Sequence, residues 1–116
     1  MRKRLLLLLL VFVLVFSGAQ AARKKIEVAM ISPALTSTFY IATNAGATEV
    51  AKELGWNLYK LAPDRETNFQ AQVSMAEDMI QRNVDAIAIC AINDKAIVAA
   101  VEKANKAGIP CSSLTP

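Results

Sequence analysis

The chain has 116 residues, with 13 Lys and Arg, 10 Asp and Glu, and no histidine. A chain of this length holds one small domain, and without histidine it lacks the commonest general base and metal ligand. Three of the basic residues and none of the acidic ones lie within the first 21 positions. The rest is therefore close to neutral and lacks the clustered basic surface of nucleic-acid-binding proteins.

The first 21 residues have the pattern of an export signal. A basic start at residues 1–4 is followed by an apolar run of 12 residues at 5–16, and small residues flank Gln20. This is the order of a secretory signal peptide, and the run is shorter than the roughly 20 residues of a spanning helix. We predict that residues 1–21 are a signal peptide cleaved after Ala21. The remainder is then periplasmic and meets the membrane only through that transient segment.

The first strand and helix of the mature sequence are expected between residues 25 and 55. Residues 25–31 form an apolar run typical of a buried strand, and 32–38 are rich in turn and capping residues. From residue 39 the apolar positions recur at helical spacing, and Gly55 is suited to end the helix. The face predicted to be buried consists of Ala47, Val50, Ala51 and Leu54.

The same alternation follows a second time. Residues 56–61 predict a strand and 62–66 a polar connection, after which Thr67 and Gln70 have the spacing of a capping box. Asn83, which tolerates the left-handed conformation, is suited to end this second helix. Its apolar stripe consists of Phe69, Val73, Ala76 and Ile80.

A third unit and the start of a fourth complete the pattern. Residues 86–91 form a nearly continuous apolar run, typical of a strand covered on both faces. Asn93 or Asp94 is expected to cap a third helix that ends at Gly108, and 109–114 predict a fourth strand. The alternation predicts an α/β fold, a three-layer doubly wound parallel sheet. Ligands of such sheets bind beyond the carboxyl ends of the strands, here in loops 32–38, 62–66 and 91–95.

The residues offer no enzyme chemistry, cofactor site or metal site. The sequence has no glycine-rich phosphate loop, no nucleophile elbow and no clustered carboxylates. Cys90 lies within an apolar strand, which predicts a buried, inert thiol. If the third and fourth strands are neighbours, Cys111 is offset from Cys90 by roughly 10 Å, which exceeds the limit of about 7 Å for a disulfide. We expect two free thiols.

The first loop carries the residues best suited to a ligand. Thr36–Tyr40 places hydroxyl groups beside two adjacent aromatic rings, Phe39 and Tyr40, at the mouth of the predicted sheet. Aromatic faces edged by neutral polar groups suit a sugar, which has apolar faces and a rim of hydroxyls. Alternatively, Phe39 packs beneath the start of the helix and the Ser and Thr residues only cap it.

Most of the mature sequence resembles ribose-type periplasmic sugar-binding proteins. The resemblance lies in the order and spacing of Ile26–Ser32, Thr38–Tyr40, Asn44–Ala47, Glu53–Trp56, Gln72, Glu77–Ile80, Val84–Ile87 and Lys103–Pro110. It implies the fold of a two-lobed protein that closes around a monosaccharide and delivers it to the membrane subunits of an ABC importer. It also implies that Ser32, Ser37, Phe39 and Tyr40 contact the sugar. Thr38 stands where many members have proline, and the loop is one residue longer.

The end of the sequence departs from the same family. Members continue from the segment matching Ile109 and Pro110 into an Asp, often followed by Arg, which bind sugar hydroxyls; the counterparts here are Thr115 and Pro116. We therefore interpret residues 22–116 as an incomplete first lobe, from a truncated or frameshifted product or an incomplete gene model, that binds sugar weakly or not at all alone. The alternatives are the effector domain of a lactose-repressor-type regulator, a small exported flavodoxin-like protein, and a product that misfolds.

Overall fold

The computed structural model describes residues 23–114. The predicted signal peptide, and Thr115 and Pro116, lie outside the described residues. No helix within 23–114 has both the length and the apolar character needed to cross a bilayer. The elements follow one another in the predicted order: β1 (Glu27–Ile31), α2 (Thr38–Leu54), β2 (Asn57–Leu61), α3 (Phe69–Gln81), β3 (Ala86–Ile89), α4 (Asp94–Lys106) and β4 (Cys111–Ser113).

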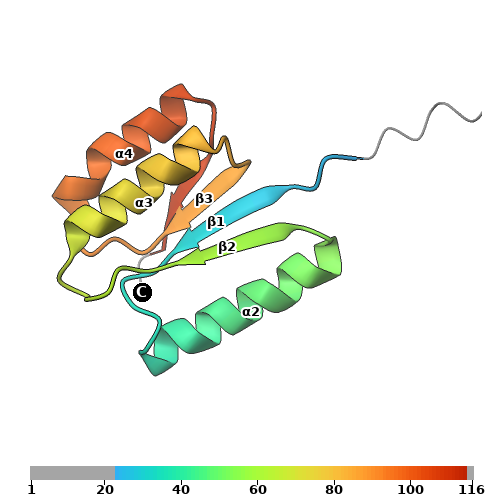
Figure 1. The fold of residues 1–116 in the computed structure, drawn as a ribbon, viewed down its shortest axis with the longest axis horizontal. Helices are drawn as coiled ribbons and strands as arrows, with labels where there is room; N and C mark the ends of the chain where they lie inside the picture. The colour runs from blue at the N-terminus through green and yellow to red at the C-terminus, as the bar shows by residue number, and fades with distance from the viewer. Residues whose placement is uncertain (1–22, 115–116) are drawn as a thin grey trace, which may run out of the picture.

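The four strands form one parallel sheet in the order β2-β1-β3-β4. Helix α2 covers one face, and α3 and α4 lie side by side on the other (Figure 1). This confirms the predicted three-layer α/β fold. Ile31 at the end of β1 pairs with Leu61 and with Ile89, so the carboxyl ends of the three strands meet at one edge.

The hydrophobic core lies between the sheet and helices α3 and α4. Residues paired across parallel strands point to the same face, so Ala29 and Ile87 point toward these helices, as do Ile31 and Ile89. Their exposed fractions are between 0% and 2%. The helices and turns complete the cluster with Ala76, Met79, Val84, Ile97, Ala100, Ala104 and Ile109.

The opposite face of the sheet is packed much less completely. Ala51 of α2 is buried as predicted, but Val50 and Leu54 are 52% and 53% exposed, so their predicted burial is wrong. Helical spacing places all three on one face, but α2 contacts mainly β2 and leaves its outer flank uncovered among the described residues. A hollow of about 290 Å³, lined largely by apolar side chains, lies between α2 and the sheet.

The helix ends show which capping predictions hold. Gly55 has a φ of 70° and Asn83 a φ of 57°, the left-handed conformation expected of both. Asn93 caps α4 by accepting a hydrogen bond from the backbone of Ala96 at 2.9 Å. The predicted start of α3 at Thr67 is wrong, because the side chain of Asn68 accepts from the Ala71 amide instead.

Candidate functional site

A small hollow opens at the carboxyl edge of the sheet, on the face that α2 covers. Its volume is about 140 Å³. It lies between the ends of β1 and β3, the first turns of α2, and the residue after β4. Its walls are formed by Met30, Ser32, Phe39, Tyr40, Thr43, Cys90 and Leu114, none of which is charged.

Ser32 is fixed in the hollow by both its backbone and its side chain. Its amide donates to the carbonyl of Leu61 at 2.9 Å, which extends the pairing of β1 with β2 by one residue. Its hydroxyl accepts a hydrogen bond from the side-chain amide of Asn44 at 3.3 Å. Ser32 is only 1% exposed, so its hydroxyl is held in a defined position rather than solvated.

Phe39 and Tyr40 meet edge to face in the first turn of α2. Their ring centroids are 5.2 Å apart and the ring planes cross at 80°, an arrangement that aromatic pairs favour. Phe39 is 56% exposed, so the interpretation that it packs beneath the start of the helix is wrong. The ring of Tyr40 is half-buried. The pair therefore gives the hollow one exposed and one partly covered aromatic wall.

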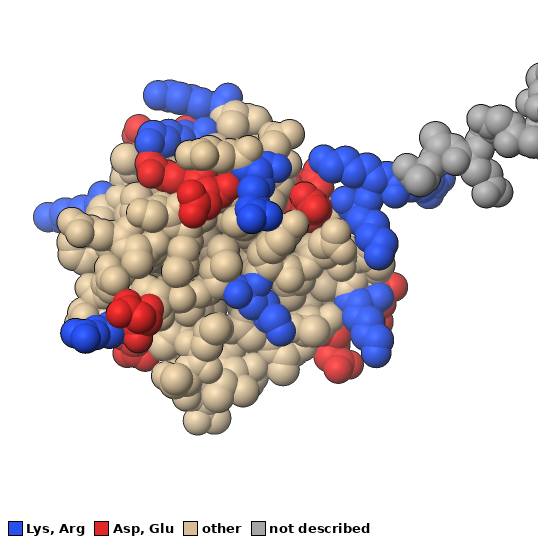
Figure 2. Space-filling view, viewed as in Figure 1, with Lys and Arg blue, Asp and Glu red and all other residues tan. Residues whose placement is uncertain are grey.

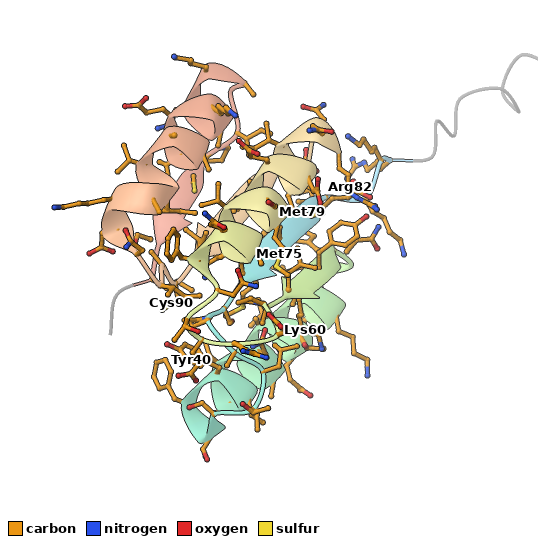
Figure 3. All side chains as sticks on the ribbon, turned by 60° about the vertical axis from the view of Figure 1, so that its left-hand side comes forward. Tyr40, Lys60, Met75, Met79, Arg82 and Cys90 are labelled. Carbon is orange, nitrogen blue, oxygen red and sulfur yellow. The ribbon has the colours of Figure 1, made fainter. Side chains whose placement is uncertain are left out.

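Tyr40 is tied to the end of β3 by Cys90. Its hydroxyl lies 3.6 Å from the Cys90 sulfur, and the two residues lie near each other at the lower end of the sheet in Figure 3. This hydrogen bond, together with burial, raises the pKa of Tyr40 to about 12. The phenol is therefore neutral at physiological pH and can either donate or accept a hydrogen bond.

The two cysteines are free thiols, as predicted. Cys111 pairs with Ile87 and so points toward α3 and α4, where burial raises its pKa. Cys90 follows Ile89 in the chain, lines the hollow on the opposite face, and is 8% exposed. Its predicted burial is confirmed, but its place in the wall of the hollow was not foreseen.

Ser37 is the one candidate residue that stands outside the walls of this hollow. It occupies the N-cap position of α2 with extended backbone angles, and its hydroxyl makes no capping hydrogen bond. The structure therefore brings Ser32, Phe39 and Tyr40 together and leaves Ser37 beside them. The capping interpretation of the Ser37 hydroxyl is wrong.

Several residues of this region were missed by sequence reasoning. Asn44 lies one turn after Tyr40 and is 7% exposed. The spacing of Asn44, Ala47 and Ala51 marks an inward stripe of α2, so a polar residue on that stripe was an available signal. The other residues missed in the walls of the hollow are Met30, Thr43, Cys90 and Leu114.

Gln72 holds the loop that follows β3. Its side chain donates to the carbonyl of Cys90 at 2.8 Å and accepts from the amide of Ile92 at 2.9 Å. Gln72 is 1% exposed. Both ends of its amide are thus used to fasten the backbone beside Cys90 to α3.

A larger hollow of about 460 Å³ lies beside α3, on the other face of the sheet. It is lined by Asp78, Gln81 and Arg82 as well as by apolar residues. In Figure 3, Met75 and Met79 lie along α3 and Arg82 lies at its carboxyl end. The Arg82 guanidinium lies 5.7 Å from the centre of the Tyr59 ring. In the view of Figure 2 most charged side chains lie around the margin, and a basic side chain lies near the centre of the face.

A sequence profile of the Periplasmic binding protein domain matches residues 28–114. The chain belongs to this family. Among curated members, it is 31% identical over 88 residues to the ribose import binding protein of Bacillus subtilis, covering 76% of this chain and 28% of that protein. It is 30% identical over 83 residues to the D-allose-binding periplasmic protein of Escherichia coli, covering 72% and 27%. The chain thus spans less than a third of these periplasmic binding proteins.

Solved structures of periplasmic binding proteins share the fold of this chain. A periplasmic solute-binding protein of an ABC transporter from Actinobacillus succinogenes, solved with bound D-allose, superposes with a TM-score of 0.73 at 32% identity. The alignment covers 75% of this chain and 30% of that one. A solute-binding protein from Burkholderia multivorans gives a TM-score of 0.74 at 31% identity, covering 78% and 33%.

Proposed function

We propose that this chain forms one wall of a monosaccharide-binding site in the solute-binding component of an ABC sugar importer. One observation carries the proposal: the uncharged hollow at the carboxyl edge of the sheet, whose walls include Ser32, Tyr40 and the exposed Phe39. A sugar ring combines apolar C–H faces with a rim of hydroxyls. Aromatic walls and neutral polar groups match both features.

The character of the relatives supports a sugar over other ligands. Two curated relatives are named for ribose and allose, and one solved relative contains D-allose. The absence of charged residues from the walls of the hollow fits a neutral ligand. On this proposal the protein is a binding protein rather than an enzyme, and its partners are the sugar and the membrane subunits of the importer.

The size of the hollow supports weak binding by this chain alone. Its volume of about 140 Å³ is well below the roughly 300–1,000 Å³ of typical small-molecule sites. One wall also leaves the second face of a sugar in water. We expect dissociation constants no tighter than about 1 mM, equivalent to a binding free energy of about −4 kcal/mol.

A titration followed by amide NMR tests the proposal. D-Allose and D-ribose, added to high millimolar concentration, should shift the resonances of Ser32, Tyr40 and Cys90 and leave those of Asp78 and Arg82 unchanged. Shifts confined to the hollow beside α3, or no shifts at all, would contradict the proposal. Micromolar affinity by calorimetry would contradict the expected weakness while leaving the ligand class intact.

Two tyrosine variants provide a matched comparison for the titration. Tyr40→Phe removes one hydroxyl from the hollow, and Tyr59→Phe removes one from the opposite face of the sheet. Loss of one neutral hydrogen bond should weaken sugar binding about three- to tenfold for Tyr40→Phe. Tyr59→Phe should bind like the wild type. Equal effects of both variants would indicate a change in stability rather than a lost contact.

The proposed periplasmic location is tested at the N-terminus. Expression in a Gram-negative host, followed by fractionation and N-terminal sequencing, should give a periplasmic protein that begins at Ala22. Recovery of the protein with Met1 intact would contradict cleavage.

A further inference from the structure

Asn44 is the polar residue whose role the proposed sugar site leaves unexplained. Its side-chain nitrogen lies 2.8 Å from the carbonyl oxygen of Tyr40 and 3.3 Å from the hydroxyl of Ser32. A backbone carbonyl can only accept a hydrogen bond, so the nitrogen of the Asn44 amide, and not its oxygen, must face Tyr40. The backbone of α2 therefore fixes which way the amide points.

This orientation decides how Ser32 can bond. A hydroxyl has one proton to donate and two lone pairs that accept, and the amide of Asn44 occupies one lone pair. Within residues 23–114 the Ser32 hydroxyl makes no other hydrogen bond. Ser32 is 1% exposed and lines the hollow, so its proton is left for an oxygen atom that enters the hollow.

The oxygen of the Asn44 amide carries a cost that its bonds within the fold do not offset. It is buried and has no hydrogen-bond partner among the described residues. Buried polar atoms without partners are uncommon and costly. An apolar side chain of similar size would avoid that cost, but it would also leave the direction of the Ser32 hydroxyl undefined.

We propose that Asn44 is a positioning residue that commits the Ser32 hydroxyl to donate its proton into the hollow. This wall then selects a ligand with an acceptor oxygen, a sugar hydroxyl or ring oxygen, at that point, and disfavours a deoxy analogue that lacks it. The inference rests on the proposed sugar site for its ligand. The direction of the Asn44–Ser32 hydrogen bond is independent of that site.

The hydrogen bond is tested first, without any ligand. The side-chain amide protons of Asn44 are followed by NMR in the wild type, in Ser32→Ala and in Thr48→Val. Ser32→Ala should move one of the two protons upfield, because its acceptor is gone. Thr48→Val is the matched control, since Thr48 donates to the backbone of Asn44 from an exposed position. An Asn44 amide that does not respond to Ser32→Ala overturns the inference.

Sugar titrations then test the positioning role. Asn44→Leu and Ser32→Ala should each weaken binding of D-allose or D-ribose about three- to tenfold, the effect of one neutral hydrogen bond. The double variant should be no weaker than Ser32→Ala, because both changes act through the same bond. Asn44→Leu should keep a thermal midpoint near that of the wild type, which separates positioning from a structural role.

Two further outcomes are informative. Wild-type affinity in Asn44→Leu, with reduced affinity in Ser32→Ala, would overturn the positioning role. If neither sugar shifts any resonance of the wild-type hollow, the proposed function fails, and the ligand part of the inference fails with it. The amide measurement still decides the direction of the Asn44–Ser32 bond in that case.

Discussion

The Tyr40 hydroxyl and the Cys90 sulfur lie 3.6 Å apart, although 50 positions separate them in the sequence. This contact joins the first turn of α2 to the end of β3, two elements with few other contacts. It also places the phenol hydroxyl of the Phe39–Tyr40 aromatic pair next to a thiol. The contact therefore links the geometry of the candidate site to a measurable ionisation.

The ionisation of Tyr40 should follow the Cys90 contact. In a Tyr59→Phe background, Tyr40 is the sole tyrosine, so ultraviolet absorbance at high pH reports its pKa alone. We expect a pKa of about 12, against the ordinary 10.0, chiefly because of the hydrogen bond with Cys90. Adding Cys90→Ala should move the pKa back toward 10. An unchanged pKa would show that the thiol is not the cause.

The same shift sets a pH dependence of stability. The folded pKa of Tyr40 lies above the unfolded value, so the contribution to stability is fully present below about pH 10 and is lost as the pH rises through about 12. Urea unfolding of the wild type between these values should show a decline that is smaller in Cys90→Ala. Equal declines in the two proteins would contradict the linkage.

Truncation of a buried and of an exposed isoleucine should have very different effects on the free energy of unfolding. Ile89 is 1% exposed in the core and Ile41 is 53% exposed on α2. Ile89→Ala should lower the free energy of unfolding by about 2–5 kcal/mol, through lost burial and a residual cavity. Ile41→Ala should change it by about 0.5 kcal/mol at most. Urea denaturation measures both, and a cooperative transition in the wild type would also show that these residues fold by themselves.

The loop after β3 should depend on Gln72. Gln72→Leu leaves the Cys90 carbonyl and the Ile92 amide without their partner, at a cost of about 1–3 kcal/mol for each unsatisfied buried group. Faster hydrogen exchange at Ile92 should accompany the loss. Gln70→Leu is the matched control, because Gln70 is exposed on the same helix. Similar destabilisation by both variants would contradict a specific role for Gln72.

The helix caps offer a paired prediction. Asn93→Ala removes the bond to the Ala96 amide and should destabilise the protein by about 1 kcal/mol. Ser37 occupies the corresponding N-cap position of α2, where its side chain makes no capping bond. Ser37→Ala should therefore change the free energy of unfolding by less than about 0.5 kcal/mol. Thermal denaturation compares them, and a larger effect at Ser37 would show a capping bond that the structure lacks.

Local sequence signals predicted the elements of the fold well. Strand–helix alternation gave the element order, and Gly55, Asn83 and Asn93 end or begin helices as expected. The start of α3 was misjudged because Thr67 and Asn68 are both good caps. The choice depends on the preceding loop, where the Asn68 amide also donates to Asp64.

The candidate site was only partly predictable. The positions of Ser32 and Tyr40 at the site follow from their place after β1. Cys90 follows β3, and the apolar pattern of that strand does not indicate which residues of other elements Cys90 contacts. Periodicity likewise gave Val50 and Leu54 a common face with Ala51, yet whether a face is covered depends on its neighbours in space. These errors all concern contacts between elements, which one sequence does not encode locally.

The unequal packing of the two faces of the sheet has a consequence for local unfolding. Strands β1 and β3 are held by the densely packed core, whereas α2 buries few side chains. Helix α2 should therefore open at a much lower free energy and have the least protected amides of the three helices within residues 23–114. The hollow lies between these two kinds of element. A sugar that contacts both Tyr40 and Cys90 would act as a clamp on α2, so occupancy should be visible as slower amide exchange along the whole helix, well beyond the residues it touches.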